Sequence, residues 1–360
     1  MTTADTTTRE QRVNSVRIID EYYWMLLRHL HNAVSEKLGE PGMRALAEGF
    51  RQYGHYRGEG IRQNPQSLAE GRDALSLLRA WDIGDILLVH PDVHLEVEGD
   101  PSQTTIRLPE VPGSNYFASR EGGEILATYW SETLAGLAAG YDDQLSVSRS
   151  EIAAAGNGSL AITWSYSGDT LDSATDTPRD PFADAAASIR LSRRSFGVFA
   201  ALGMYVYRAL TRRFDATGEE LVRGALYSFG LERAQGMREQ AIEQGLPINF
   251  KSWFDIIQQR DPNANSFVFR GDTRISPGVF QVTCTYCPCA EVWVEEGHDG
   301  LAFGYIYDME VHRGLVEGFH PGGVVAWDKV KTRGDKVCNF RFSIPELVTK
   351  DDPEWAHQSI

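Results

Sequence analysis

The spacing of apolar residues predicts two long helices at the start of the chain. Residues 13–38 carry apolar side chains every three to four positions, which is the period of an amphipathic helix. Gly39 and Pro41 follow this run, and both residue types are typical of helix ends. A second helix is therefore predicted over residues 41–63.

The segments that follow complete one group of elements, and the same order then repeats. The first group is predicted to continue with strands at 93–99 and 104–111, a helix at 122–140, and a hairpin at 145–164 with its turn near Gly156–Gly158. Residues 165–187 are rich in Ser, Thr, Asp and Pro without periodicity, which indicates a linker. The second group is predicted as helices at 198–214 and 218–244, strands at 266–272 and 277–284, a helix at 301–318, and a hairpin at 323–344. Because helices precede strands in each group, the predicted fold class is α+β, with two repeated modules that each place helices before a small antiparallel sheet.

Residue identities also repeat between the two groups, which predicts an internal duplication. At an offset of 176 (218 − 42 = 176), Gly42, Gly54, Arg57, Gly60 and Arg62 coincide with Gly218, Gly230, Arg233, Gly236 and Arg238. Residues 137–164 align with 315–342 at an offset of 178 (315 − 137 = 178). The predicted divisions are a disordered tail at 1–12, a first module at 13–165, a linker at 166–189, a second module at 190–345 and a tail at 346–360. The matched Arg57 and Arg233 are interpreted as structural ion-pair residues.

The two modules differ in their reactive residues. Cys284, Cys287 and Cys289 align with Leu108, Val111 and Gly113, while Asp308, His312 and Cys338 align with Trp130, Leu134 and Leu160. The first module therefore has apolar or small residues wherever the second has reactive ones. We expect a structural first module and a chemically competent second module.

Composition excludes several classes of function. The net charge of −15 argues against a nucleic-acid surface, which requires clustered Lys and Arg. No run of about 18 apolar residues is present, so no membrane span is expected. The first twelve residues lack the basic start and apolar stretch of a secretory signal. All four cysteines follow residue 283, which does not resemble a disulfide scaffold, and reduced thiols in a cytoplasmic protein fit better.

The cysteine cluster is the strongest chemical signal, and three interpretations of it stay open. Cys287 and Cys289 flank Pro288 beside a predicted helix start at Ala290–Glu291, and a helix N-terminus stabilises a thiolate. The cysteines are therefore candidate nucleophiles, with a nearby His or carboxylate as acid or base. Alternatively, they are inert buried thiols, or thiolate ligands of a zinc ion with His298, His312 or His320.

The stretch 287–342 resembles the L-2-amino-thiazoline-4-carboxylic acid hydrolase family. The matching positions are Cys287-Pro288, Asp308, Phe319, Pro321, Gly334, Cys338 and Phe340-Arg341-Phe342. Cys284 and Cys289 are additions to the family pattern. The resemblance implies a hydrolase that opens a C–N or C–S bond of a small cyclic or amidine-like substrate with a cysteine nucleophile, in specialised metabolism.

The resemblance also implies roles for single residues. Either Cys287 or Cys289 is expected to be the nucleophile, and either Asp308 or His312 the acid or base. The residues expected to bind substrate are Glu291, Lys331 and Arg341. No cofactor is expected, and the partners are a small-molecule substrate and a second copy of the chain in a homodimer. The alternative is a sensor module without catalysis, which binds a small ligand or a metal such as zinc through Cys284 and Cys338.

Overall fold

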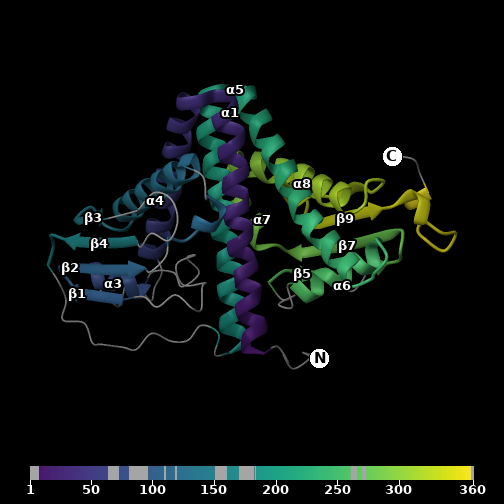
Figure 1. Ribbon diagram of the computed structural model, residues 1–360, viewed down its shortest axis with the longest axis horizontal. Helices are drawn as coiled ribbons and strands as arrows, with labels where there is room; N and C mark the ends of the chain where they lie inside the picture. The colour runs from purple at the N-terminus through teal and green to yellow at the C-terminus, as the bar shows by residue number, and fades with distance from the viewer. Residues whose placement is uncertain are drawn as a thin grey trace. The chain divides into compact units, whose positions relative to one another are not determined.

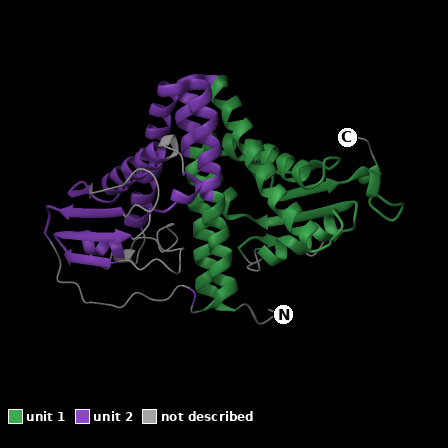
Figure 2. Cartoon of the chain, viewed as in Figure 1, with its two compact units in different colours: residues 1–22, 184–204, 216–360 green, residues 23–183, 205–215 purple. Residues whose placement is uncertain are grey.

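The computed structural model forms two compact units. It describes residues 8–63, 73–80, 96–108, 111–117, 120–150, 160–169, 182, 184–260, 266–269 and 273–357. Unit 1 comprises residues 1–22, 184–204 and 216–360, and unit 2 comprises residues 23–183 and 205–215 (Figure 2). The helices α1 (Arg9–Gln63) and α5 (Ala185–Glu243) each supply residues to both units. The module boundaries given above stay a prediction.

Unit 2 contains a four-stranded antiparallel sheet with helices beside it (Figure 1). Its further elements are α3 (Ala74–Ala80), β1 (Glu96–Asp100), β2 (Gln103–Leu108), η2 (Ser114–Tyr116), α4 (Arg120–Tyr141), β3 (Leu145–Ser150) and β4 (Leu160–Tyr166). The strand order is β1-β2-β4-β3. Leu108 pairs with Leu160 and Ile106 with Ile162, and all four side chains are buried. One face of this sheet therefore forms part of the apolar core.

Unit 1 contains a five-stranded antiparallel sheet. Its further elements are α6 (Phe250–Arg260), β5 (Val268–Phe269), β6 (Arg274–Ile275), β7 (Val279–Tyr286), α7 (Pro288–Glu295), α8 (Gly297–Phe319), β8 (Val324–Lys329), η3 (Lys331–Arg333), β9 (Cys338–Ser343), η4 (Pro345–Leu347) and η5 (Glu354–His357). The strand order is β5-β7-β9-β8, and β6 also pairs with β7. The Trp253 ring of α6 packs against Phe280 and Phe342, and the His312 ring of α8 packs against Phe340 and Phe342. Both helices therefore contact the same face of the sheet.

The two sheets share one topology, and the α+β prediction is confirmed. In unit 2, β1 and β2 precede α4, and β3 and β4 follow it; in unit 1, β5, β6 and β7 precede α7 and α8, and β8 and β9 follow them. In each sheet the last strand lies between the strand before the helical segment and the strand after it. The pairs Leu108–Leu160 and Cys284–Cys338 occupy equivalent places in these sheets, at the offsets of 176 and 178 (284 − 108 and 338 − 160). The alignment made from residue identities therefore places strand partners correctly.

Both long helices bend at matched positions. Gly39 in α1 has φ 53° and ψ −141°, and Asp215 in α5 has φ 48° and ψ −128°, again separated by 176 residues (215 − 39 = 176). The prediction that one helix ends and a second begins near Gly39 and Pro41 is confirmed as a bend. The equivalent break predicted between residues 214 and 218 falls at Asp215.

Close helix packing at glycines is also repeated. A Cβ atom at Gly54 would lie 2.1 Å from the Thr133 carbonyl oxygen of α4. A Cβ atom at Gly230 would lie 2.3 Å from the Val311 carbonyl oxygen of α8. Only glycine permits backbones to approach so closely. The matched glycines thus hold α1 against α4 in unit 2, and α5 against α8 in unit 1.

The sequence pattern missed or misplaced several elements. It did not predict α3, α6 or the short 3-10 helices, and it placed the start of α7 two residues late. The helix α5 begins at Ala185 behind an Asp184 N-cap, inside the segment interpreted as a linker, and α1 begins at Arg9 inside the predicted tail. The predicted turn at Gly156–Gly158 lies outside the described residues. Within the described part of the chain, no helix has the length and apolar character needed to cross a membrane.

We expect Asp215→Gly to stabilise the protein. Asp215 is exposed and holds a positive φ of 48°, a conformation that costs a residue with a side chain about 1 kcal/mol and costs glycine almost nothing. The free energy of unfolding, measured by chemical denaturation, should rise by about 1 kcal/mol. The matched control is Gly39→Ala, which meets no atom within 4 Å and should lower that free energy by a similar amount. A neutral or destabilising Asp215→Gly would contradict this account of the bend.

Candidate active site

Cys287 occupies the N-terminus of α7 in unit 1. It has extended backbone angles, and Pro288 follows it as the first helical residue, where the missing N–H of proline costs nothing. The thiol of Cys289, the backbone N–H groups of Ala290 and Cys289, and the Lys331 ammonium together lower the pKa of Cys287. Burial acts in the opposite direction, but the donors prevail. Cys287 is therefore the cysteine whose thiolate is stabilised.

Cys289 serves as a hydrogen-bond donor to Cys287. Its buried thiol donates to the Phe196 carbonyl oxygen at 3.5 Å and also lies within hydrogen-bonding reach of the Cys287 sulfur. This bond to Cys287, together with burial, raises the pKa of Cys289 well above its usual range. The pair thus shares one proton, held by Cys289. The sequence left the choice between these two cysteines open, and the geometry distinguishes them.

Asp308 is a buried carboxyl group on α8. Only 6% of the residue is exposed, and burial together with the nearby Cys287 raises its pKa well above the ordinary value. Among the described residues, no ion pair to this carboxyl is found. Asp308 is therefore a neutral acid that can donate a proton.

His312 lies one helical turn after Asp308 and contacts the sheet. Its ring centroid is 4.5 Å from that of Phe340, and its Nδ1–H donates to the Asp308 carbonyl oxygen at 2.8 Å. Burial, with a smaller contribution from the Arg233 charge, lowers the pKa of His312 to about 4, while the hydrogen bond to Asp308 acts in the opposite direction. The imidazole is therefore neutral, with Nε2 available as a proton acceptor. The contact between Asp308 and His312 is made through the backbone carbonyl of Asp308.

Cys284 and Cys338 lie opposite each other on β7 and β9. Both are buried free thiols, and burial raises the pKa of each, that of Cys338 to about 12. The Cys284 thiol donates to the Tyr286 carbonyl oxygen at 3.0 Å, and the Cys338 sulfur accepts from the Lys331 N–H at 3.3 Å. The negative charge of Cys287 contributes to both shifts, so all four cysteines are neighbours.

Cys284 and Cys338 were the predicted ligands of a metal ion under the alternative interpretation. In the described ranges, no group of three His, Cys, Asp or Glu side chains is arranged to hold a metal ion. Each of the two sulfurs has a backbone hydrogen-bond partner instead. Binding of zinc through these two cysteines stays a prediction.

Lys331 and Glu291 form an ion pair at the edge of the cysteine cluster. Glu291 lies in the first turn of α7, and Lys331 begins η3. The side chain of Lys331 is mostly buried, and its ammonium contributes to the lowered pKa of Cys287. Both predicted binding residues are thus beside the thiolate, but each already has the other as its partner.

Arg341 lies on the other face of the sheet. It is adjacent along β9 to Phe340, whose ring contacts His312, and neighbouring residues of a strand point to opposite faces. Its guanidinium pairs with Asp328 at 3.3 Å and lies 5.5 Å from the Trp355 ring centroid. The structure therefore does not bring Arg341 to the cysteines.

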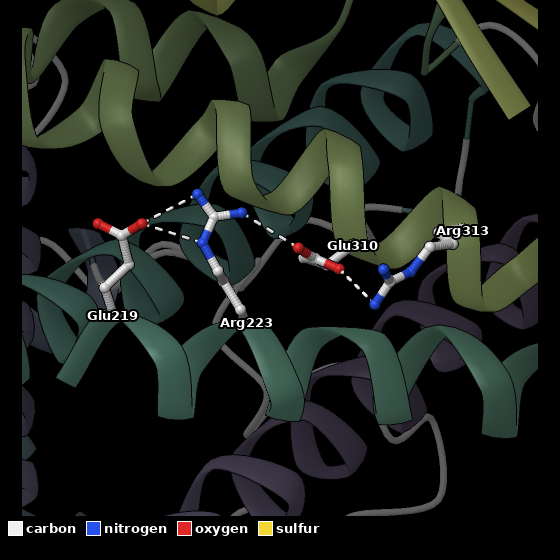
Figure 3. A network of polar contacts seen from close by, with 4 residues as sticks. All are labelled: Glu219, Arg223, Glu310 and Arg313. Atoms are coloured by element: carbon white, nitrogen blue, oxygen red, sulfur yellow. Dashed lines mark hydrogen bonds and ion pairs between the residues drawn. The ribbon is translucent and has the colours of Figure 1, made fainter. Parts of the chain in front are cut away.

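A polar network on α8 lies apart from this cluster (Figure 3). Glu310 accepts from Arg223 of α5 at 3.1 Å and from Arg313 at 2.8 Å. Arg223 also pairs with Glu219 at 2.9 Å. These charges join α5 to α8 and are interpreted as structural.

The matched place in unit 2 is filled with apolar groups. Trp130, at the position of Asp308, packs 6.1 Å from Trp24 and 5.2 Å from Tyr129 between ring centroids. Gly113, at the position of Cys289, would bring a Cβ atom within 2.6 Å of the Trp24 ring. Aromatic and small residues therefore occupy this place in unit 2, and the structural role of the first module stays a prediction.

The structure adds to the site two residues that were not assigned to it from the sequence. Tyr307 precedes Asp308, and burial raises its pKa. Arg233 of α5 was interpreted as structural, yet its charge acts on Tyr307, Cys289 and His312. The match between Arg57 and Arg233 was the only sequence feature that pointed to Arg233. This match could not show that thiols lie beside Arg233 and not beside Arg57.

A cavity of about 500 Å³ lies between α8 and the segment that runs from β8 to Asp335. Its walls are formed by Tyr305, Met309, Trp327, Asp328, Val330, Arg333 and Asp335. Trp327 pairs across strands with Phe340, which carries the His312 contact. The cavity thus adjoins the strand pair that supports His312.

The neutral His312 should make stability depend on pH. The unfolded chain binds a proton near pH 6.5, and the folded chain does so only near pH 4, so the stability present above pH 6.5 is lost as the pH falls toward 4. Asp308, with a raised pKa, gives the opposite trend in the wild type and in a His312→Asn variant alike. Between pH 7 and pH 4.5, denaturation should show that the wild type loses about 1–3 kcal/mol more than His312→Asn. Equal losses would show that His312 titrates normally.

Comparison with known proteins identifies the part of the chain that holds this site. Residues 195–342 match the family model described as L-2-amino-thiazoline-4-carboxylic acid hydrolase. No curated protein and no solved structure is significantly similar to the chain. The match does not extend to residues 13–165, so the duplication stays a prediction. Over residues 195–342, which include the four cysteines, Asp308 and His312, the chain is similar to the L-2-amino-thiazoline-4-carboxylic acid hydrolase family.

Proposed function

We propose that this protein hydrolyses a small cyclic, amidine-like molecule and opens its C–N or C–S bond, with Cys287 as the nucleophile. The observation that carries the proposal is the position of Cys287 at the N-terminus of α7, where the Cys289 thiol and two backbone N–H groups stabilise its thiolate. A substrate of a specialised metabolic pathway agrees with the family. Similarity to the family supports a hydrolase on C–N bonds, and the nucleophile and the substrate are part of the proposal.

The first half of the reaction forms a covalent intermediate. The Cys287 thiolate attacks the amidine carbon of the ring, and neutral Asp308 gives its proton to the ring nitrogen. The C–S bond of the resulting tetrahedral adduct then breaks, and the departing sulfur takes the proton of Cys289. The ring is now open, and its former amidine carbon is bound to the Cys287 sulfur.

The second half adds water and releases the enzyme. Neutral His312 accepts a proton from water through Nε2 as the oxygen attacks the carbon bound to Cys287. The C–S bond to Cys287 breaks, and the thiolate leaves. The two protons lost from water return to Asp308 and Cys289, so the net change is the addition of one water molecule to the substrate.

This mechanism predicts that Cys287→Ala abolishes turnover with little loss of stability. Removal of a nucleophile costs about 10³-fold or more in kcat/KM, while Cys287 is only partly buried and contributes little to the core. The assay follows thiol release from L-2-amino-thiazoline-4-carboxylate beside thermal melting. Alkylation by iodoacetamide at pH 7, mapped by mass spectrometry, should modify Cys287 before the other three cysteines, because only its pKa is lowered.

The matched residues of unit 2 give the controls. Val111→Ala should remove buried apolar contact, and Gly113→Ala would force a side chain against Trp24 at a positive φ of 87°. Both should lower the melting temperature and leave the activity per folded molecule unchanged. Full activity in Cys287→Ala, or first alkylation at another cysteine, would reject Cys287 as the nucleophile.

A further inference from the structure

Arg233 holds a positive charge inside unit 1 without an acidic partner. Its guanidinium carbon lies 3.9 Å from the Tyr22 ring centroid and 5.2 Å from that of Phe229. Its Nε atom is buried and has no hydrogen-bond partner, and no carboxylate among the residues described lies within ion-pair distance of it. Burial acts to lower the pKa of Arg233, but Tyr22, which shares a hydrogen bond with the guanidinium, and the nearby Tyr307 raise it, so the group stays charged. A buried charge without an opposite charge is costly, and what the site lacks is an anion.

Packing places this guanidinium beside the reactive groups. Gly230, one turn earlier on α5, lies against the Val311 carbonyl of α8. Phe229 contacts Phe199, and Phe199 contacts Tyr307, which is next to Asp308 in the chain. The Arg233 charge is close enough to act on Cys289 and Tyr307.

The two cations predicted from the sequence to bind substrate already have carboxylate partners. Lys331 is paired with Glu291 beside the cysteines, and Arg341, on the other face of the sheet, is paired with Asp328. Among the described residues, no hydrogen bond or ion pair joins Asp308 to Arg233. Of Lys331, Arg341 and Arg233, only Arg233 is therefore not already paired with a carboxylate and can pair with an anionic ligand.

Arg57, the matched arginine of unit 2, shows which contacts of Arg233 are explained by packing alone. Arg57 lies 5.3 Å from the Tyr53 ring centroid, as Arg233 lies 5.2 Å from that of Phe229. The charge of Arg57 acts on Tyr23, whose hydroxyl shares a hydrogen bond of 2.6 Å with that of Tyr129 in a cluster without cysteines. The ring contact is common to both arginines, and only Arg233 has thiols beside it.

We propose that Arg233 binds the anionic group of the substrate, a carboxylate, and thereby positions the substrate ring against the Cys287 sulfur. The inference rests on the proposed function and adds to it the residue that selects an anionic substrate. A guanidinium can donate two parallel hydrogen bonds to a carboxylate, which fixes orientation as well as position. Arg233 is a positioning residue in this scheme and exchanges no proton.

The first test uses substrate kinetics. Arg233→Met should raise KM for L-2-amino-thiazoline-4-carboxylate about 10- to 100-fold, with a smaller effect on kcat. KM for the uncharged methyl ester should stay within about twofold of the wild-type value. Arg233→Lys keeps the charge and loses the bidentate geometry, so its KM for the acid should lie between those of the wild type and of Arg233→Met. An equal loss for acid and ester would show a structural role only, and would overturn the proposal.

The second test does not depend on turnover, so it separates this inference from the proposed function. L-2-amino-thiazoline-4-carboxylate should raise the melting temperature of the wild type and of Arg57→Met, but not that of Arg233→Met. The rate of Cys287 alkylation by anionic iodoacetate, relative to neutral iodoacetamide, should fall about tenfold in Arg233→Met and stay unchanged in Arg57→Met. An unchanged ratio, or a thermal shift that survives in Arg233→Met, would reject the role of Arg233 even if Cys287 is catalytic. If Arg233→Met loses both effects while the wild type shows no turnover, the anion-binding role of Arg233 is supported and the proposed hydrolase activity is rejected.

Discussion

The contact between two helix backbones at glycine is the constraint on which the site depends. In unit 1, α5 meets α8 where Gly230 lies on the Val311 carbonyl and Gly314 on that of Tyr227. A side chain at either glycine would separate the helices. Arg233 follows on one helix and Asp308 and His312 lie on the other, so the distance between the cation and the acid–base pair is determined by this contact. The charged network of Glu310 with Arg223 joins the same two helices.

A second constraint is electrostatic. Four thiols, a carboxyl group and an imidazole are enclosed together, and a low-dielectric interior does not tolerate several anions. Only Cys287 has donors from a helix N-terminus and a lysine, so it holds the negative charge. That charge keeps the proton on Asp308 and contributes to keeping it on Cys289. One stabilised thiolate thus determines which neighbours are proton donors.

Unit 2 shows the same framework without the chemistry. The ring pair Tyr23–Tyr129 has its centroids 6.1 Å apart at 77°, and the matched pair Phe199–Tyr307 has 6.1 Å and 79°. Around this common pair, Trp130, Leu134 and Leu160 stand where unit 1 has Asp308, His312 and Cys338. Apolar groups fill space at no electrostatic cost, whereas buried ionisable groups need partners. The reactive cluster of unit 1 therefore costs stability, which is typical of a functional site.

Much of the fold could be read from local patterns. Helix periodicity, the Gly39–Pro41 break and the alternation of strands predicted the α+β order, since these signals depend on neighbours within a few residues. The offsets of 176 and 178 also agree with the strand pairing, since Leu108 faces Leu160 in one sheet and Cys284 faces Cys338 in the other. Short elements such as α3 and α6 escaped because seven to eleven residues carry little periodic signal.

The sequence by itself determined which residues are candidates for the chemistry, and the tertiary structure decided how they lie relative to one another. Cys287, Cys289, Asp308 and His312 were predicted as site residues, because these residue types are reactive when they occur together. The sequence could not tell which cysteine ionises, that Arg341 lies on the far face of the sheet, or that Arg233 has no acidic partner in the described part of the chain. Protonation depends on burial and on donors brought from distant segments, and those are products of packing rather than of spacing along the chain.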